Sequence, residues 1–399
     1  MQQSSFTRWV TIAILTLGSF VVTWATRPAP HKLKLQSRQR PLNEHIQPAR
    51  VSSRALPPIN RLLENFFKGT DLQWYGNISV GNPPQELSVV FDTGSHEFEV
   101  ASHNSPGCTN KILFDPTRST TFIDGGEEHN ISFATGIGVD PVKDDNYEIT
   151  VRSAFDTLWV EDLSVANLSF NIITSLPPTF ASAPFSGIHG MSAVAEGLFS
   201  GLIMQGLPSL FGMYLTPHCV GNAEITLGGI DESKFKGTPI YGTLDPQLDL
   251  DWQLTAVKIS VNGKTADILS RNTSIFFDSG TSNFAAPDGI AQAIYSLISA
   301  DIKPYPDLPG AYGIACDKIP LLPAQIDLTF ASQSGEPFNL TIPSSELSVG
   351  PFAGNESHCQ TSINGGDAVW DILLGGSLLK HYYSIWDVGG KRIGFAPIV

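Results

Sequence analysis

Charged residues are scarce in this chain of 399 residues. They make up 16% of it, while apolar residues reach 42%. A disordered chain combines high charge with low hydrophobicity, so that class is excluded. Basic residues are the scarcer sign, with 24 Lys and Arg against 38 Asp and Glu, and the formal net charge of −14 argues against a nucleic-acid partner. The four cysteines are too few for a disulfide scaffold, and their spacing is not that of a zinc site.

Two hydrolase motifs are also absent. The sequence contains no H-E-x-x-H and no G-x-S-x-G, which disfavours a zinc protease and a serine hydrolase of the common types. Turn-forming residues, by contrast, are plentiful, with 36 Gly and 28 Pro that follow no collagen-like period. Together with many Val, Ile, Thr and Phe residues, this composition predicts an all-β protein, and the length allows two or three domains.

The N-terminus carries one apolar run. Residues 9–25 follow Arg8 and end at Ala25, a pattern that predicts a cleaved signal peptide over residues 1–25. A signal anchor is the alternative, because the run nearly suffices to span a bilayer. Cleavage would make the protein secreted, or direct it to a vacuole or lysosome-like compartment.

Charge is distributed unevenly along the rest of the chain. Residues 26–68 hold nine Lys or Arg and two Glu, a net charge of +7, whereas residues 69–399 have a net charge of −22. A basic leader on an acidic body suggests an electrostatic latch that releases as carboxylates protonate. A disordered basic linker explains the same charges, and both interpretations stay open here.

Six N-x-S/T sequons fit a secreted glycoprotein. We expect no sugar on the first two, which fall in predicted strands. The six are Asn77, Asn130, Asn167, Asn272, Asn339 and Asn355.

An internal repeat carries the candidate chemistry. The segments Phe91–Ser95 and Phe277–Thr281 share the pattern aromatic, Asp, hydroxyl, Gly, hydroxyl, and lie 186 residues apart. Each is followed, after 98 and 97 residues, by a short segment ending in Gly, at residues 188–190 and 373–375. Two features at matching offsets indicate two lobes of similar topology, each presenting one Asp on a tight loop.

The pattern has a physical reason. Gly permits a sharp turn, and short hydroxyls can orient a neighbouring carboxylate. A lone Asp directly after an apolar strand would be costly to bury, whereas two that face each other can share a proton. Such a pair, here Asp92 and Asp278, can deprotonate a water with one member and protonate a carbonyl with the other.

From about residue 72 to its end, the chain resembles the pepsin-like aspartic endopeptidases. The resemblance rests on both Asp-containing loops and on four further segments, namely residues 74–85, 223–231, 370–387 and 394–396. It implies an all-β, bilobal fold with a cleft between an N-terminal lobe over residues 69–222 and a C-terminal lobe over residues 223–399. It also implies a basic propeptide over residues 26–68 and neither a metal nor a cofactor.

The resemblance assigns roles to individual residues. Asp92 and Asp278 would be the catalytic pair, and a disulfide would join Cys316 to Cys359. The supporting loop residues would be Thr93 and Ser279, which tie the loops together, Ser95 and Thr281, which bond the outer carboxylate oxygens, and Gly94 and Gly280. Residues 131–136 would form the flap that closes over substrate, with Phe133, Ala134, Thr135 and Gly136 at the substrate.

Several positions depart from the family pattern. Phe133 stands where the flap normally carries Tyr, and Glu99 stands where a Trp usually packs behind the flap. His189 replaces an aliphatic residue, and Ser186 and Gly376 each replace a common Asp. These changes bear on substrate preference and turnover rate. A bond between Cys108 and Cys219 is open, since secretion favours pairing all four cysteines.

We therefore expect a monomeric acid endopeptidase made as a zymogen, with a polypeptide substrate and its own propeptide as inhibitor. We expect no nucleic-acid partner and no stable membrane association after signal cleavage. The mature enzyme should begin near residue 69, and one helix is expected over residues 288–300. Two alternatives remain, a weakly active or inactive homologue that acts as a binding protein and a carbohydrate-active β protein with two carboxylates.

Overall fold

The computed structural model describes residues 55–105, 107–108, 110–136, 138–142, 147–246, 250–366 and 371–399. The description below concerns the unit Val51–Val399. The predicted signal peptide and the leader as far as residue 54 lie outside the described residues, as does Trp370.

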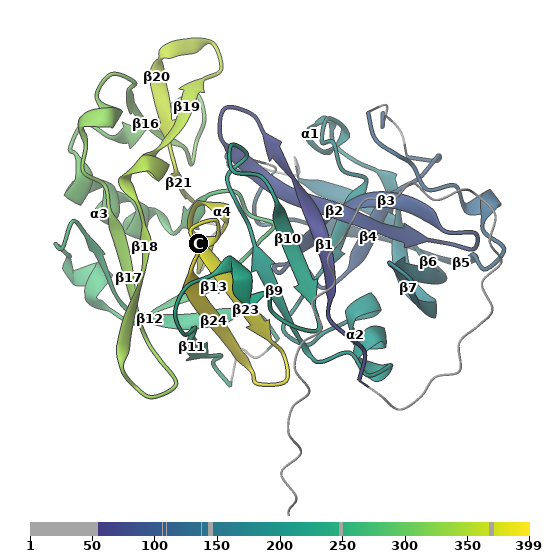
Figure 1. Cartoon of the computed structure of the whole chain (residues 1–399). Helices are drawn as coiled ribbons and strands as arrows, with labels where there is room; N and C mark the ends of the chain where they lie inside the picture. Colours follow the sequence, from purple (N-terminus) through teal and green to yellow (C-terminus); the bar gives the residue numbers. More distant parts are fainter. Residues whose placement is uncertain are drawn as a thin grey trace, which may run out of the picture. The chain divides into compact units, whose positions relative to one another are not determined.

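Strands dominate this unit, as the composition predicts (Figure 1). The largest sheet has the order β11-β24-β23-β9-β10-β1-β2-β3-β8-β4-β7-β6-β5. Its strands are β1 (Ile59–Phe67), β2 (Asp71–Val80), β3 (Gln85–Asp92), β4 (Phe98–Ala101), β5 (Ile123–Ser132), β6 (Glu148–Val160), β7 (Leu163–Ser175), β8 (Gly187–Gly190), β9 (Leu210–Tyr214), β10 (Ala223–Leu227), β11 (Ile240–Thr243), β23 (Tyr382–Asp387) and β24 (Arg392–Pro397).

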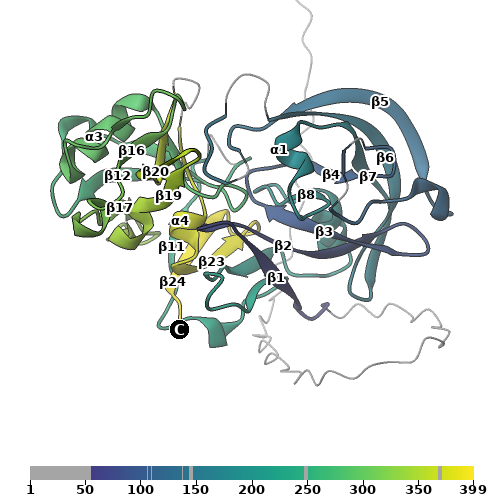
Figure 2. The same ribbon diagram turned by 90° about the horizontal axis from the view of Figure 1, so that it is seen from above.

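Two smaller sheets belong to the C-terminal half. One has the order β18-β17-β12-β13-β22-β14-β21 and the other the order β15-β16-β20-β19. Their strands are β12 (Gln253–Val261), β13 (Thr273–Phe277), β14 (Phe284–Ala286), β15 (Lys303–Pro304), β16 (Tyr312–Ala315), β17 (Ile326–Ala331), β18 (Pro337–Ile342), β19 (Ser348–Phe352), β20 (Asn355–Thr361), β21 (Ile363–Gly365) and β22 (Ile372–Leu374). Figure 2 shows the strands of the two halves gathered on opposite sides of β23 and β24.

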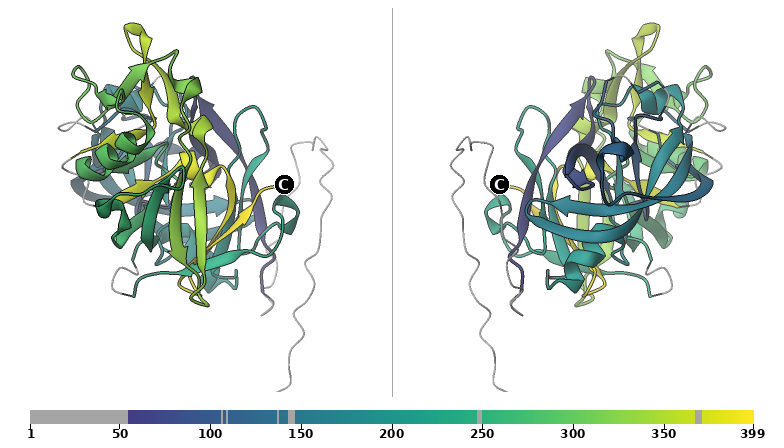
Figure 3. Two further views of the ribbon diagram at one scale, coloured as in Figure 1. Left: turned by 90° about the vertical axis from the view of Figure 1, so that its left-hand side faces the viewer. Right: turned by 90° about the vertical axis from the view of Figure 1, so that its right-hand side faces the viewer.

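Helices are few and short in the described chain. The longest, α3, coincides with the predicted helix and buries Ala291, Ile294 and Tyr295 at the i, i+3, i+4 spacing of one helical face. Figure 3 shows α3 on the outer side of the C-terminal lobe and the long strands β5 and β6 on that of the N-terminal lobe. The α-helices are α1 (Pro178–Ala181), α2 (Gly197–Met204), α3 (Asp288–Ile298) and α4 (Gly376–Leu379), and the 3₁₀ helices are η1 (Pro116–Arg118), η2 (Glu232–Lys234), η3 (Asp267–Ser270), η4 (Ile319–Leu321) and η5 (Ser344–Leu347).

The internal sequence repeat corresponds to the same strand pairing in both lobes. In the N-terminal lobe β3 runs parallel to β8, with Asp92 opposite Gly190, and β4 pairs antiparallel on the other side of β8. In the C-terminal lobe β13 runs parallel to β22, with Phe277 opposite Leu374, and β14 pairs antiparallel on the other side of β22. The prediction of two lobes with related topology is confirmed, and the matched offsets arise because each Gly-ending segment is the parallel partner of an Asp-bearing strand.

Strand β1 lies within the span predicted as propeptide. It pairs antiparallel with β10 through Ile59–Leu63 and with β2 through Glu64–Phe67. Ile59 and Leu63 are buried in the main core. The predicted lobe boundary at residues 222 and 223 falls at the start of β10, inside the same sheet.

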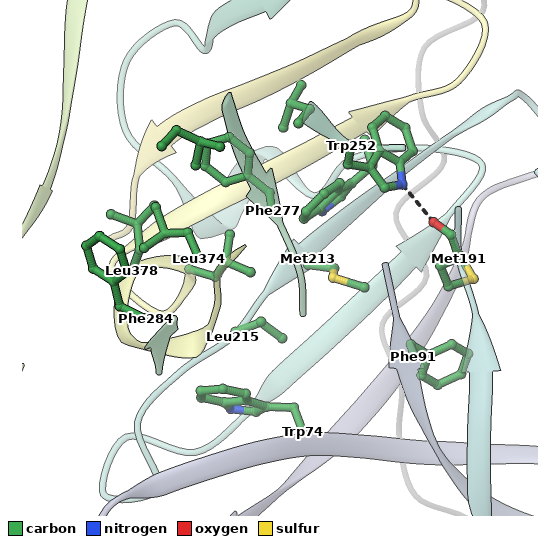
Figure 4. Packing of buried hydrophobic residues seen from close by; sticks show 14 of the residues in the cluster. Trp74, Phe91, Met191, Met213, Leu215, Trp252, Phe277, Phe284, Leu374 and Leu378 are labelled. Carbon is green, nitrogen blue, oxygen red and sulfur yellow. Dashed lines mark hydrogen bonds between the residues drawn. The ribbon is translucent and has the colours of Figure 1, made fainter. Parts of the chain in front are cut away.

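One core extends through both lobes (Figure 4). Phe91 of β3 and Phe277 of β13 both belong to it, and the Trp252 indole donates a hydrogen bond of 2.8 Å to the carbonyl oxygen of Met191. This packing explains how the ends of two distant strands are held in a common position.

The cysteines divide as the resemblance implied. Cys316 and Cys359 form a disulfide in the C-terminal lobe, which confirms that prediction. Cys108 is a buried free thiol and Cys219 an exposed one, so the bond that the sequence left open between them is not formed.

Candidate active site

The two Asp-bearing loops bond to each other reciprocally. The Thr93 amide donates to Ser279 Oγ at 3.0 Å, and the Ser279 amide donates to Thr93 Oγ1 at 2.9 Å. Each hydroxyl also donates across the interface to the residue before the opposite Asp, with Thr93 Oγ1 bonding the Phe277 oxygen and Ser279 Oγ the Phe91 oxygen. These residues are buried, so the four bonds fix the loops as one unit.

Inside each loop the carboxylate is held in the same way. Asp92 accepts from the Gly94 amide at 2.8 Å and from Ser95 Oγ at 2.6 Å. The Asp278 carboxylate accepts from the Gly280 amide at 2.7 Å and from Thr281 Oγ1 at 2.5 Å. Each carboxylate therefore has one oxygen bonded to a backbone amide and the other to a hydroxyl.

The loop glycines are needed for close approach. A Cβ on Gly94 would lie 2.6 Å from Cγ of Asp278, and one on Gly280 would lie 2.5 Å from Cγ of Asp92. Real Cβ contacts are essentially never under 3.0 Å. Each glycine thus lets the opposite carboxyl enter the loop, which brings the two Asp side chains together as the sequence predicted.

Electrostatics favour a shared proton. Burial, followed by the charge of Asp278 and a hydrogen bond to it, raises the pKa of Asp92 well above its ordinary value, whereas bonds from Ser95 and Gly94 oppose the rise. Like charges this close cannot both ionise readily, so the pair titrates as a unit. One member can act as an acid while the other acts as a base.

The carboxyl pair opens onto a cleft of about 500 Å³. Described residues from both lobes line it. Beside Asp92, Gly94, Ser95, Asp278 and Gly280 they are Gln73, Val90, His96, Glu97, Glu99, Ile131, Ser132, Phe133, Ala134, Thr135, Gly136, Phe180, Ile188, Asp251, Phe276, Asp371 and Leu373.

The predicted flap residues lie on this cleft. They follow the end of β5, which forms an antiparallel hairpin with β6. The Phe133 ring packs on Phe180 with centroids 5.2 Å apart, and Thr135 Oγ1 lies 2.6 Å from Thr281 Oγ1. The flap therefore contacts a hydroxyl that itself bonds Asp278.

Two of the unusual residues are buried near the pair. His189 lies between Phe91 and Phe98, with ring centroids 5.9 and 5.2 Å away, and burial lowers its pKa to about 4. Glu99 is 1% exposed and lines the cleft, and burial raises its pKa well above the ordinary value, with the charges of Asp92 and Glu97 acting in the same direction.

Sequence reasoning missed several cleft residues. Gln73 Nε2 donates to the Gly280 oxygen at 2.7 Å and so supports the second loop from β2. Asp251, Asp371 and Phe180 line the cleft from three distant parts of the chain. No local motif marks these four residues, because only the tertiary fold brings them to the carboxyl pair.

The described residues contain neither a metal-binding cluster nor a membrane-spanning helix. No cluster of three or more His, Cys, Asp or Glu side chains in that part of the chain is placed to hold a metal ion. Within the same residues, no helix is both long and apolar enough to cross a membrane.

Comparison with known proteins agrees with this geometry. The chain is 31% identical over 345 residues to gastricsin of Cavia porcellus, covering 82% of this chain and 80% of that protein. It is 30% identical over 348 residues to cathepsin E of Aquarana catesbeiana, with 82% and 80% covered, and 31% identical over 341 residues to embryonic pepsinogen of Gallus gallus, with 82% and 81% covered. The family model described as eukaryotic aspartyl protease matches residues 73–398, and the chain therefore belongs to that family.

Proposed function

We propose that this protein is an endopeptidase that hydrolyses peptide bonds at acidic pH through a water held between Asp92 and Asp278. The observation that carries the proposal is the reciprocal bonding of the two loops, which points two buried carboxyls at each other. The carbohydrate-active alternative is set aside, because the matching family is that of aspartyl proteases.

The geometry supports general acid–base catalysis. The ionised carboxyl takes a proton from the water, whose oxygen adds to the peptide carbonyl carbon, while the protonated carboxyl donates to the carbonyl oxygen. The tetrahedral intermediate then collapses. Its C–N bond breaks, the leaving nitrogen takes the proton that the first carboxyl received from the water, and a hydroxyl of the intermediate returns a proton to the second carboxyl as the new carbonyl forms. No covalent bond to the protein forms. The raised pKa of Asp92 supplies a group that stays protonated to a higher pH than an ordinary Asp.

The substrate would be a polypeptide in an extended conformation. The cleft is lined by residues of both lobes, and an extended chain laid along it can bond backbone groups of the flap as an added strand does. The flap would close over this chain, exclude water and position the scissile bond.

The proposal is tested by digestion of a denatured protein from about pH 2 to 7, with and without a statine-type inhibitor, beside Asp92→Asn and Asp278→Asn. We expect inhibitable activity at acidic pH and a loss of at least about 1,000-fold in either variant. Activity that survives in a folded Asp278→Asn protein would contradict the mechanism.

We also propose synthesis as a secreted zymogen with the basic leader as inhibitor. The seven Lys or Arg and one Glu of residues 27–58 complement the acidic remainder of the chain. Because Ile59 and Leu63 are buried in the core, we now place the proposed cut before β1 rather than near residue 69. N-terminal sequencing of acid-treated protein tests this, and a first residue between 50 and 59 is the expected result.

A second candidate function is that of a binding protein with little or no activity. The observation in its favour is the contact between Thr135 and Thr281, which places the flap against the hydroxyl that serves Asp278. Thr135→Val removes this contact. If wild-type protein freed of its leader is inactive and Thr135→Val restores acid proteolysis, the flap holds the site closed and the binding function is favoured.

A further inference from the structure

The buried carboxyl of Glu99 has no partner within the protein. Both of its oxygens lack a hydrogen bond, and the residue is 1% exposed. An unpartnered polar group in such a place costs free energy, and native proteins rarely retain one without a use. The Glu99 carboxyl is therefore a candidate to bind a hydrogen-bond donor from a ligand, because the chain itself supplies none.

Sheet register shows where Glu99 faces. Ile188 of β8 is directly opposite Glu99 on one side and directly opposite Val90 of β3 on the other. Side chains of directly paired residues point to the same face of a sheet. All three line the cleft, so Glu99 lies in the cleft wall beside two aliphatic side chains.

Among the described residues, one cation lies near Glu99. Phe133 and Phe180 line the cleft with Glu99, and Lys111 lines a second, small cavity together with Glu99 and Phe180. The Lys111 ammonium, however, donates to the Phe180 carbonyl oxygen at 2.8 Å. By contrast, the neighbouring acid Glu97 is already bonded by Asn171 and by His129.

The rest of the cleft is acidic as well. Among its described lining residues there is no Lys or Arg, and the one basic side chain, His96, lies 3.1 Å from Asp251 and 3.3 Å from Glu196. Six carboxyls line it, those of Asp92, Glu97, Glu99, Asp251, Asp278 and Asp371. Such a site attracts cationic segments and disfavours acidic ones.

We propose that Glu99 is a specificity-determining residue that receives a cationic side chain of the substrate, Lys or Arg, at the subsite formed with Phe133 and Ile188. The aliphatic stem of the basic residue would lie along the apolar walls, while its charged end donates to the carboxyl and favours the ionised form of that carboxyl. This inference rests on the proposed function and names its substrate class, namely polypeptides with a basic residue next to the scissile bond.

The test uses the full chain, activated in acid, and peptide pairs that differ only in Lys or norleucine at each position around the scissile bond. Norleucine keeps most of the stem and lacks the ammonium. Protonation of the Asp pair affects the kcat/KM of both peptides equally, so it drops out of their ratio. We expect wild type to prefer Lys by about 10-fold or more at one position, and Glu99→Leu to reverse the preference there.

Two matched variants separate charge from folding. Glu99→Gln keeps the shape, and we expect it to lower the Lys preference without reversing it. Asp156→Asn alters another buried acid of the same lobe, whose Oδ2 also lacks a partner and which lies off the cleft. We expect Asp156→Asn to leave the ratio unchanged. An equal Lys-to-norleucine ratio in wild type and folded Glu99→Leu would overturn the inference.

Measuring peptide affinity tests the Glu99 subsite independently of whether the protein cleaves peptide bonds. Reduced-amide versions of the two peptides cannot be cleaved, and calorimetry measures their affinities even if the protein cuts nothing. Tighter binding of the Lys peptide that disappears in Glu99→Leu supports the subsite, whatever the turnover. Equal binding of both peptides, combined with a lower melting temperature of Glu99→Leu, would assign Glu99 a structural role instead.

Discussion

At the residue scale, the positions of the two loop glycines, Gly94 and Gly280, accept no larger residue without displacing a catalytic side chain. A single methyl group on either would enter the space of the opposite carboxyl group. The lack of a side chain at Gly94 and Gly280 is thus as much a part of the site as the two Asp side chains.

We expect Gly94→Ala and Gly280→Ala each to lower kcat at least about 100-fold, because the opposite carboxyl must move by a sizeable part of an ångström. Inhibitable acid proteolysis measures the loss. Gly289→Ala in α3 is the matched control, since a Cβ there meets only Ile268 of η3, at 3.5 Å. It should keep full activity and gain a little stability. Wild-type kcat in a folded Gly280→Ala protein would contradict the geometry.

A second prediction at this scale concerns stability against pH. Burial lowers the pKa of His189 to about 4 from 6.5, so the unfolded chain binds more protons than the folded one between these values. The protein therefore loses stability as pH falls from 6.5 to 4, by about 3 kcal/mol at 1.4 kcal/mol per unit. Relative to wild type, His189→Leu should gain about this amount between pH 7.5 and 3.5.

Urea unfolding at each pH measures this change. His103→Leu serves as the control, because His103 is an exposed side chain of the same lobe. Parallel stability curves for wild type and His189→Leu would show that His189 is not the group responsible.

At the element scale, β1 is paired on both sides within the largest sheet. A chain that begins at residue 55 keeps the pairing of β1 with β10 and β2, whereas one that begins at residue 69 exposes two strand edges. Loss of Ile59 and Leu63 from the core alone lowers the free energy of unfolding by about 3–6 kcal/mol. We expect the shorter chain to aggregate or to melt at least about 10 °C lower in a thermal unfolding scan. Equal melting temperatures would return the maturation site to residue 69.

Much of the arrangement of the strands could be predicted from the sequence. The repeated Asp-hydroxyl-Gly pattern and the offset Gly-ending segments indicated two lobes with related strand pairing, because both reflect one short parallel ladder in each lobe. The acidic lining was not predictable. Asp251 and Asp371 carry no local signal and reach the cleft only through long-range folding. The sequence marks Glu99 as a departure from the family pattern, yet its lack of any partner depends on side-chain packing.

At the scale of the whole molecule, charge separates the leader from the rest. Residues 27–58 contain seven Lys or Arg and one Glu, while residues 69–399 carry a net charge of −22. We expect a synthetic peptide of residues 27–58 to inhibit the active enzyme, and its inhibition constant to rise at least about 10-fold between 0.05 and 0.5 M NaCl. A peptide with Gln at the seven basic positions is the control. Inhibition that does not respond to salt would contradict the electrostatic latch, and a lack of inhibition would favour the linker interpretation.

The reciprocal bonds between the two loops also bear on the order in which the chain is made. The first Asp leaves the ribosome 186 residues before the second, and each loop takes hydrogen bonds that only the other loop provides. A chain that contains only one lobe therefore lacks the hydrogen bonds that hold its Asp-bearing loop in the catalytic geometry. Proteolytic competence thus arises in a single late step, and a nascent or truncated chain is harmless to the compartment that synthesises it.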